Sequence, residues 1–469
     1  MKVNRRLAAF GAALFCLSAL PATPARADDQ AAVLLAKHRA FAGWQFGDGS
    51  LHTFRIAGTI TDEKGKTIED LTMLRAGLVF NDADTDLKRG GVTEHVGFTG
   101  NLFWRSDPSG FTIPVYGNLA RYEASLSVLW NEGTTQLPAT YVRAATVDGQ
   151  AVGVVRVTLA GADPIELYVN QETGAYVRAV VDPDGAYDTT IHILKYAEAL
   201  PGKKIISSYR FDDDKDVTAY SKIEPNVAID ASELHPPPAT ASWTFESQEP
   251  TPITLTHDRI LIDLTINGVK GRFILDTGAD GIYLNDKFAD RAKTLPLEGS
   301  ATAASIYEEV PIRARRVDSL SFGGATLHNF LASSQNFDRD DSRGLDWQGY
   351  DGLIGFDFFA GAIVKLDTYA SKVTVLDPST DLSAAPGVPV IVDLSAGTPA
   401  VPMMLNKTID VNALLDTGNP GLVLFGPDLR KKRHLNILGC GNFERLELGP
   451  VVYANQAACE WGSPATIFC

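Results

Sequence analysis

The sequence has few cysteines and lacks the signatures of several hydrolase classes. Its 469 residues include four cysteines and eight histidines. The histidines form no His-Glu-x-x-His pair, and the cysteines and histidines do not have zinc-ligand spacing. A Gly-x-Ser-x-Gly turn, which would carry a serine nucleophile, is also missing. Metal-dependent and serine hydrolysis are therefore disfavoured, and neither a metal nor another cofactor is expected.

Clustered positive charge and long apolar runs are also absent from most of the chain. The formal net charge is −15, and the lysines and arginines form no stripe, so no nucleic-acid partner is expected. After residue 27, no run approaches the roughly 20 apolar residues that span a bilayer. The mature chain is therefore expected to have no membrane span.

Residues 1–27 have the pattern of a secretory signal peptide. Lys2, Arg5 and Arg6 precede an apolar stretch, and Ala25-Arg26-Ala27 is a small-x-small cleavage site. Asp28 would then begin the mature chain, which we expect to be periplasmic or secreted.

Three cysteines follow this signal: Cys440, Cys459 and Cys469. An oxidising compartment permits one disulfide among them and leaves one thiol over. A disulfide between Cys440 and Cys459 would fasten the last segment of the chain, and we take it as the candidate. The sequence alone leaves all three pairings open.

Two proline-containing connectors divide the mature chain. Consecutive prolines join neither a helix nor a strand ladder, so they indicate a stiff, extended linker. The predicted parts are an N-terminal domain (28–235), a Pro-rich linker (236–242), a first repeat (243–378), a second linker (379–387) and a second repeat (388–469).

The N-terminal domain is predicted to be β-rich and to open with a helix at Asp29–Ala42, where apolar residues have helical spacing. Turn residues at short intervals then predict a large antiparallel sheet that curls. Its expected strands are Leu51–Ile60, Tyr141–Ala145, Val152–Leu159, Ile165–Val169, Tyr176–Val181, Thr189–Tyr196 and Lys204–Phe211. The segment from Ile165 onward resembles periplasmic lipoprotein-carrier-like domains, which are half-open sheets that cradle acyl chains. A structural or substrate-presenting role is the favoured interpretation.

An acidic cluster in this domain has the odd-position spacing of a calcium loop. It consists of Asp82, Asp84 and Asp86. Leu87 stands where the turn glycine of such a loop belongs, and Thr93 stands where the closing glutamate belongs. We therefore expect a solvated loop there.

The strongest feature of the chain is an eleven-residue motif that occurs twice. Ile274–Leu284 reads ILDTGADGIYL, and Leu414–Leu424 reads LLDTGNPGLVL, with six of eleven positions identical. Both copies follow an apolar segment of strand character. Each therefore presents an Asp-Thr-Gly loop at the end of a strand.

Around the first copy, Ile260–Ile266 and Val269–Leu275 are expected to form a hairpin through Asn267-Gly268. Asn285 is expected to cap a helix that runs to about Lys293.

A Gly/Ala/Ser/Thr-rich stretch over residues 297–310 follows this helix and includes Gly299 and Tyr307. A flap that closes over substrate and an ordinary surface hairpin are both consistent with it. Gly299 and Tyr307 are the candidate flap residues.

Further along, Leu353-Ile354-Gly355 is followed by Asp-Phe-Phe. An Asp-Thr-Gly loop after an apolar strand, combined with this later element, resembles one lobe of a retropepsin-like aspartic protease over residues 255–378. The second copy suggests a two-lobed relative of the retropepsin-like and pepsin-like enzymes. The expected fold is mainly β, with an N-terminal curved antiparallel sheet and a helix, then two retropepsin-like β-barrel lobes.

The second repeat matches the first at its front. Strands are expected at Val388–Leu394 and Val401–Leu405, and Arg445–Tyr453 corresponds to Ser319–Leu327. No counterpart of Asp351–Phe359 is expected, so the second lobe is predicted to be incomplete.

The resemblance implies an aspartic-type endopeptidase in which Asp276 and Asp416 activate a water molecule. Two carboxylates in contact share one proton, because both cannot ionise at once. The substrate would be a peptide or protein, and the sequence does not decide which aspartate carries the proton. In the loops that support the aspartates, the threonines would brace the loops, and the glycines would let the two loops approach each other closely. These residues are Thr277, Gly278, Thr417 and Gly418.

Two other functions remain open. In one, the fold is retained without catalysis, and the protein binds peptides or a lipoprotein. In the other, two chains form a homodimer in which each contributes Asp276, as single-lobe retropepsins do.

Overall fold

The structure is a computed structural model of the whole chain. It describes residues 29–183, 188–212, 215–256, 259–304, 309–337, 349–390, 392–394, 397–419, 423–426, 430–431, 434–437, 439–460 and 467–468. Two compact units are present: residues 1–87, 93–105 and 114–237 form the first, and residues 88–92, 106–113 and 238–469 the second. Among the described residues, no helix combines the length and the apolar character needed to cross a membrane.

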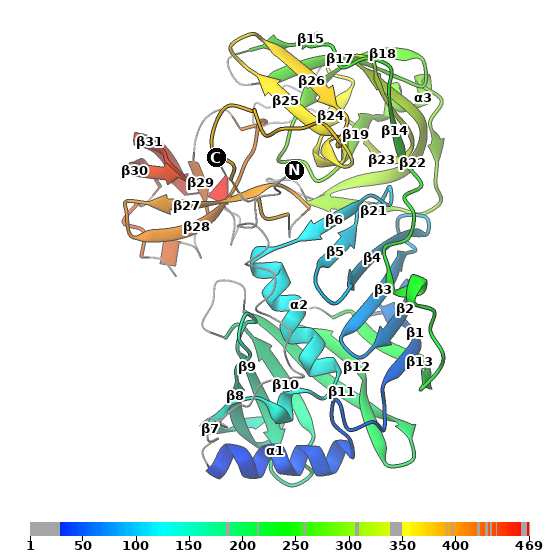
Figure 1. Cartoon of the computed structure of the whole chain (residues 1–469), viewed down its shortest axis with the longest axis vertical. Coiled ribbons are helices and arrows are strands. Elements are labelled where there is room, and N and C mark those ends of the chain that lie inside the picture. The colour runs from blue at the N-terminus through cyan, green and yellow to red at the C-terminus, as the bar shows by residue number, and fades with distance from the viewer. Residues whose placement is uncertain are drawn as a thin grey trace. The chain divides into compact units, whose positions relative to one another are not determined.

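The first unit contains a thirteen-stranded sheet whose described pairings are antiparallel (Figure 1). The order across the sheet is β6-β5-β4-β3-β2-β1-β13-β12-β11-β10-β9-β8-β7, so neighbours in sequence are mostly neighbours in space. The strands are β1 (Thr53–Thr61), β2 (Thr67–Ala76), β3 (Val79–Asp86), β4 (Val92–Phe98), β5 (Phe103–Ser106), β6 (Thr112–Val115), β7 (Ala139–Val147), β8 (Gln150–Val157), β9 (Ile165–Asn170), β10 (Tyr176–Val181), β11 (Thr189–Leu200), β12 (Lys203–Phe211) and β13 (Val217–Pro225). Every strand that the sequence predicts in this domain is present, within a few residues at its ends.

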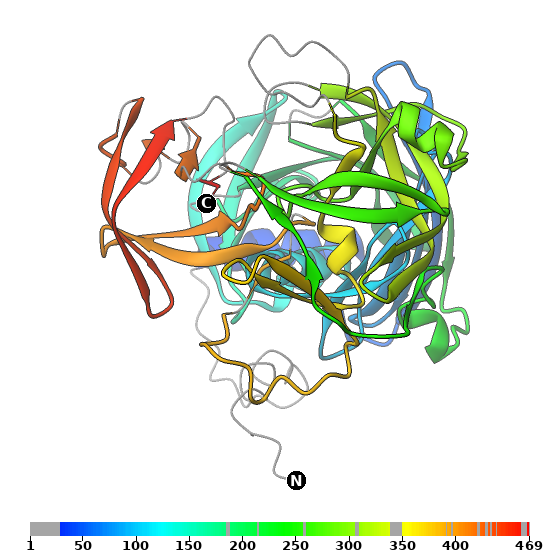
Figure 2. The same ribbon diagram turned by 90° about the horizontal axis from the view of Figure 1, so that it is seen from above.

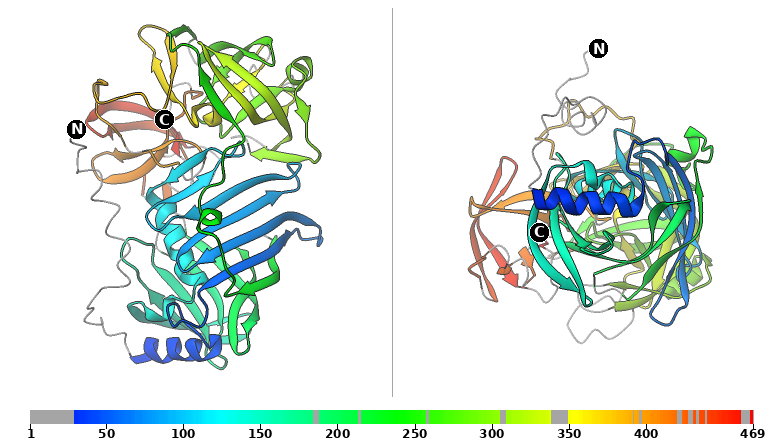
Figure 3. Two further views of the ribbon diagram at one scale, coloured as in Figure 1. Left: turned by 45° about the vertical axis from the view of Figure 1, so that its right-hand side comes forward. Right: turned by 90° about the horizontal axis from the view of Figure 1, so that it is seen from below.

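Two α-helices pack against this sheet (Figure 3). The helix α1 (Asp29–Ala42) has the predicted bounds, and it contributes Leu34 and Leu35 to the same buried cluster as Val155 and Leu167 of the sheet. The helix α2 (Gly117–Trp130) joins this cluster through Leu129. Both helices therefore cover the same face, and burial of that apolar face is the main stabilising term of the unit. Two short 3-10 helices, η1 (Thr134–Gln136) and η2 (Ala231–Leu234), complete it.

The helix α2 corrects the sequence analysis, which expects only strands after the first helix. Its N-terminal signal is weak, because Tyr116 at the N-cap makes no side-chain cap bond. The apolar periodicity of a helix is nevertheless present, at intervals of three and four residues. It is carried by Leu119, Tyr122, Leu126 and Leu129.

The expectation of a solvated loop at Asp82, Asp84 and Asp86 is wrong. All three lie in β3, which pairs with β2 over eight residues. The Asp82 carboxylate accepts a hydrogen bond from the Arg75 guanidinium. Arg75, a buried partner on the neighbouring strand β2, thus explains why the acidic Asp82 lies in a strand. The spacing of the aspartates alone does not reveal this partner.

The first repeat, within the second unit, forms a lobe around a large hydrophobic core, with a smaller buried cluster beside it. Its main sheet has the order β14-β23-β19-β24-β18-β17-β22-β20, with β16 and β21 paired at its sides and a separate sheet β15-β26-β25. The strands are β14 (Ser242–Phe245), β15 (Thr251–Pro252), β16 (Thr254–Leu255), β17 (Ile260–Ile266), β18 (Val269–Leu275), β19 (Ile282–Asn285), β20 (Leu295–Pro296), β21 (Ala301–Ala304), β22 (Glu309–Phe322), β23 (Ala325–Gln335), β24 (Gly352–Ile354), β25 (Ile363–Asp367) and β26 (Lys372–Leu376). Two helical elements join them, α3 (Asp286–Arg291) and η3 (Phe356–Phe359).

The local predictions for this lobe are confirmed. The strands β17 and β18 form the expected hairpin, and Asn267 at its turn has a positive φ of 47°. The Asn285 side chain caps α3 by accepting a hydrogen bond from the backbone N–H of Lys287 at 2.9 Å. These are short-range features, so the sequence alone specifies them.

The second repeat forms a closed barrel in the order β27-β28-β32-β29-β31-β30. Its strands are β27 (Ala400–Leu405), β28 (Ile409–Leu414), β29 (Val423–Phe425), β30 (Cys440–Leu448), β31 (Val451–Glu460) and β32 (Ile467–Phe468). Viewed from above, β27 and β28 appear in orange and β30 and β31 in red (Figure 2). The predicted strand at 388–394 is wrong for its described residues, of which only Asp393 forms an isolated bridge, to Ala400. The sequence also predicts a helix over Pro427–Leu435, and this segment lies partly outside the described residues.

Candidate active site

The first Asp-Thr-Gly loop begins where β18 ends and is held by β24. The strand β24 lies between β18, which it pairs with in parallel, and β19, which it pairs with antiparallel. The backbone N–H of Asp276 donates to the carbonyl of Ile354 at 2.9 Å. Ile354 and Leu275 are buried in the core of the lobe. The loop that carries Asp276 therefore stands on a packed strand.

The second loop also has a supporting strand, which the sequence analysis does not predict. The strand β32 pairs in parallel with β28 and antiparallel with β29, so it occupies the position that β24 has in the first lobe. Its residue Phe468 pairs with both Leu414 and Leu424. The sequence analysis expects no counterpart of Asp351–Phe359. The strand β32 is a counterpart of β24, the strand in that segment, so this part of the expectation is wrong. Counterparts of η3, β25 and β26 are not found among the described residues of the second repeat.

The sequence does not reveal β32, because this strand is two residues long and lacks the apolar-apolar-Gly pattern of Leu353-Ile354-Gly355. The sequence Ile437-Leu438-Gly439 does have this apolar-apolar-Gly pattern, but its described residues Ile437 and Gly439 lie before β30 and not in β32. The position of β32 is fixed by its pairing with strands more than 40 residues earlier in the chain.

Reciprocal hydrogen bonds between the two threonines connect the loops. The backbone N–H of Thr277 donates to Oγ1 of Thr417 at 3.0 Å, and the N–H of Thr417 donates to Oγ1 of Thr277 at 3.0 Å. The Thr277 hydroxyl donates to the carbonyl of Leu415 at 2.6 Å, and the Thr417 hydroxyl to the carbonyl of Leu275 at 2.8 Å. Each threonine thus ties its own loop to the strand end of the other lobe.

The two glycines allow the loops to approach closely. A Cβ atom on Gly278 would lie 2.5 Å from Cγ of Asp416, and one on Gly418 would lie 2.6 Å from Cγ of Asp276. Such distances are far shorter than a van der Waals contact. Any side chain larger than hydrogen at either position would push the opposite carboxyl group away.

The carboxyl groups of Asp276 and Asp416 are hydrogen-bonded to each other and half-buried. Each also accepts a hydrogen bond from its own loop, Asp276 from the N–H of Gly278 at 2.9 Å and Asp416 from the N–H of Gly418 at 2.8 Å. Burial raises the pKa of Asp276, although the bond from Asp416 opposes this. Burial, and then the charge of Asp276, raise the pKa of Asp416 to about 7. The pair therefore holds one shared proton near neutrality.

The first repeat matches a known family model. Residues 262–358 match the model of the aspartyl protease family. The part of the chain that carries Asp276 therefore has an aspartic protease fold. No curated protein sequence matches the chain significantly.

Several solved structures are similar in part. A DUF1329 family protein from Desulfovibrio piger shares 13% identity, covering 44% of this chain and 96% of that one, with a TM-score of 0.31. A LolA superfamily protein from Nitrosomonas europaea shares 14% identity, with 42% and 94% covered and a TM-score of 0.30. A retropepsin-like aspartic protease from Rickettsia conorii shares 18% identity, with 28% and 93% covered and a TM-score of 0.20.

The candidate flap is described only in part. The strands β21 and β22 form an antiparallel hairpin in which Ala304 pairs with Glu309. Gly299, before β21, is exposed and has a φ of 110°, which favours glycine. Tyr307 lies outside the described residues. Within the described part of the chain, no three His, Cys, Asp or Glu side chains are grouped as metal ligands.

Sequence reasoning missed one residue that positions the first loop. The backbone N–H of Arg272 donates to the Asp351 carboxylate at 2.9 Å, and Arg291 at the end of α3 donates to it at 2.8 Å. Asp351 thereby fixes the entry of β24 beside β18. An acidic residue directly before Gly-Leu-Ile is the only signal that the sequence offers for this role.

The predicted disulfide between Cys440 and Cys459 is present. The two cysteines are directly opposed in the β30–β31 pairing, with Cα atoms 4.0 Å apart. It fastens the open end of the hairpin that forms one wall of the second lobe.

Proposed function

We propose that the chain is an exported aspartic-type endopeptidase that hydrolyses peptide bonds with a water molecule activated between Asp276 and Asp416. The family match over residues 262–358 supports the protease class. Export is proposed from the signal-like pattern of residues 1–27, which lie outside the described residues.

The observation that carries this proposal is the mutual contact of the two loops within one chain. The Asp276 and Asp416 carboxyls are hydrogen-bonded, and a Cβ atom on either loop glycine would collide with the opposite carboxyl. A protein that only binds peptides would not need two half-buried carboxyl groups in contact, because such a pair costs stability through repulsion and desolvation.

One carboxyl of the pair carries the shared proton and the other is ionised. Asp416 has the pKa of about 7 and is assigned the proton, so it donates a hydrogen bond to the scissile carbonyl. Asp276 is assigned the ionised form, since it accepts hydrogen bonds from Asp416 and from the loop backbone. It takes a proton from the water as that water attacks the carbonyl carbon. The tetrahedral intermediate then collapses: Asp276 passes the proton from the water to the leaving nitrogen, the C–N bond breaks, and no covalent enzyme intermediate forms.

The test is peptide hydrolysis by single variants of the mature chain. Asp276→Asn and Asp416→Asn should each lower kcat/KM on a quenched-fluorescence peptide library by about 10²–10⁴-fold, which is the range for loss of a general acid or base. The matched control is Asp410→Asn, because Asp410 is exposed on β28 six residues before Asp416. This control should leave kcat/KM unchanged.

Three outcomes would contradict the proposal. Activity that survives Asp416→Asn and is lost in Asp276→Asn would favour the homodimer with two copies of Asp276. Activity that survives both variants would place catalysis elsewhere. Absence of any pepstatin-sensitive cleavage between pH 3 and pH 8 would favour a peptide-binding or lipoprotein-binding protein.

A further inference from the structure

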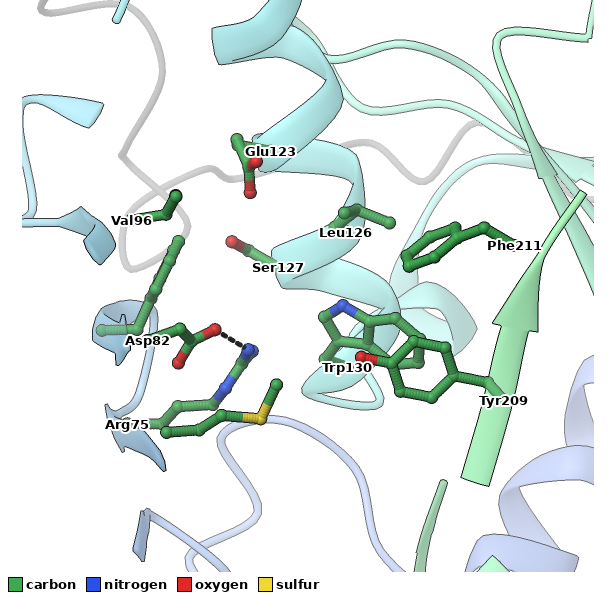
Figure 4. Close-up of a pocket in the computed structure, with 11 residues that line it drawn as sticks. Arg75, Asp82, Val96, Glu123, Leu126, Ser127, Trp130, Tyr209 and Phe211 are labelled. Atoms are coloured by element: carbon green, nitrogen blue, oxygen red, sulfur yellow. Dashed lines mark hydrogen bonds and ion pairs between the residues drawn. The ribbon is translucent and has the colours of Figure 1, made fainter. Parts of the chain in front are cut away.

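The first unit contains a cavity that the protease chemistry does not use. Its volume is about 150 Å³, and it lies between α2 and the strands β2, β3, β4 and β12 (Figure 4). A cavity of this volume holds a ligand of about six heavy atoms, the size of benzene. The side chains around it are of two kinds, aromatic and charged.

Aromatic rings form much of the wall. Trp130 at the end of α2 and Tyr209 on β12 lie with ring centroids 4.7 Å apart, and Phe211 is next to Tyr209 at 5.5 Å. Phe80 on β3 also lines the cavity. The π faces of such rings carry partial negative charge and attract cations, with indole the strongest.

The cation already present in the wall is paired with Asp82. The Arg75 guanidinium is buried, donates to Oδ2 of Asp82, and lies 5.3 Å from the centre of the Phe80 ring. The other oxygen of this carboxylate, Oδ1 of Asp82, is buried without a hydrogen-bond partner. A buried acceptor without a donor costs free energy, which a ligand with N–H groups or positive charge would recover.

A second carboxyl group enters the cavity from α2. Glu123 points into it on the same side as Ser127 (Figure 4). Burial, and then the charge of Asp82, raise its pKa to about 7, and Arg75 opposes this rise. Three phenol groups face these charges, namely Tyr122 beside Glu123, Tyr209 and Tyr220, and they stay neutral because burial raises their pKa values.

With Glu123 ionised, the cavity carries two carboxylates against one guanidinium and is left with one negative charge. We propose that it is a binding site for a small organic ammonium ion, which contacts the aromatic wall and is neutralised by Glu123 and Asp82. An acyl chain fits this chemistry less well, because it would leave Oδ1 of Asp82 without a donor and the charge of Glu123 without a counter-charge. A free amine and the ammonium head group of a lipid share the required chemistry.

The experiment is calorimetric titration of the full mature chain at pH 8 with choline and with tetramethylammonium. The matched probe is 3,3-dimethylbutan-1-ol, which has the shape of choline without the charge. Choline should bind at least about tenfold more tightly than this alcohol, because cation–π attraction and the carboxylates act only on the charged probe. Affinity for choline should fall between pH 8 and pH 6 as Glu123 becomes protonated.

Variants assign the effect to this cavity. Glu123→Gln should weaken choline binding at least about tenfold and remove its pH dependence. Glu172→Gln is the matched control, because Glu172 is exposed in the turn after β9 and does not line the cavity. Glu123→Gln also removes a repulsion with Asp82, so its thermal unfolding at pH 8 should show no loss of stability, which keeps a binding defect interpretable.

A further probe separates the two sources of the ammonium group. Lysophosphatidylcholine below its micelle concentration is compared with lysophosphatidylglycerol. Preference for the choline lipid over free choline, lost in Glu123→Gln, would support a lipid head group as the ligand. Equal binding of choline and the neutral alcohol, unchanged binding in Glu123→Gln, or no binding of any ammonium probe would each overturn the proposal. None of these outcomes bears on peptide hydrolysis by the second unit.

Discussion

The two repeats of the second unit carry nearly identical loops on unequal supports. In the first, the three residues of β24 pair with both β18 and β19, and Asp351 fixes the entry to this strand. In the second, the two-residue β32 takes the same position, and a disulfide fastens the neighbouring hairpin.

Although the supporting strands differ, the contacts between the two Asp-Thr-Gly loops are symmetric. The backbone-to-threonine bonds are 3.0 Å in both directions, and the glycine approaches differ by 0.1 Å. Each loop is held by the other as well as by its own lobe. A short supporting strand therefore suffices where the partner loop supplies part of the support.

Loss of the disulfide should have the largest effect, and it should act on the second lobe only. A cross-link over 19 residues contributes about 3 kcal/mol by the loop-entropy model. In a Cys440→Ala/Cys459→Ala variant, hydrogen exchange of β30 and β31 amides should report a stability loss of that size. Amides of β22 and β23 should be unchanged. Equal loss in both lobes would show that the two lobes unfold as one unit.

Alanine at either loop glycine should lower kcat/KM by about 100-fold, because misplacement of a catalytic group by about 1 Å has an effect of this order. Gly278→Ala displaces Asp416, and Gly418→Ala displaces Asp276, so similar losses are expected. The control is Gly441→Ala on β30, where an added Cβ meets only the side chain of Ile437, at 3.2 Å. Full activity in either loop variant would mean that the carboxyl groups need not be in contact.

Replacement of one threonine should destabilise the protein by about 1–3 kcal/mol, since its partners lose their hydrogen bonds in a partly buried site. Thr277→Val and Thr417→Val should have equal effects in urea unfolding, because their bonds are reciprocal. Serine at each position keeps the hydroxyl group and should restore most of the loss. A much larger effect at Thr417 would show that the second lobe depends more on the partner loop.

The pH dependence should give the smallest effect, about tenfold in kcat/KM per pH unit above pH 7. The pKa of Asp416 is raised to about 7 by burial and by Asp276, so the shared proton is lost above that pH. In the folded protein this carboxyl keeps its proton up to a pH of about 7. In the unfolded chain it loses the proton near the ordinary aspartate pKa of 3.8. Stability should therefore fall as pH rises from about 4 to about 7, and then level off.

Measurement of kcat/KM and of the urea midpoint from pH 4 to pH 9 checks this prediction. The Asp416→Asn variant is the control, because its midpoint should depend less on pH in this range. A rate that stays constant up to pH 9 would contradict the assignment of the proton to Asp416.

The sequence by itself determined the features that depend on neighbouring residues. The Asn285 cap, the turn at Asn267, the helix Asp29–Ala42 and the strands that deliver both Asp-Thr-Gly loops all follow from local periodicity and turn chemistry. The repeated motif also indicated that the carboxyl groups of Asp276 and Asp416 form a pair, because duplication of a loop preserves its chemistry.

Only the tertiary structure decided the features that depend on residues distant in the chain. Pairing with β28 and β29 gives Ile467 and Phe468 a role that two residues cannot signal by periodicity. The aspartates of β3 resembled a solvated loop because Arg75, the partner of Asp82, lies on another strand, and the packing of α2 over them forms the cavity. Long-range pairing and burial set the environment of a charge, and a linear sequence records neither.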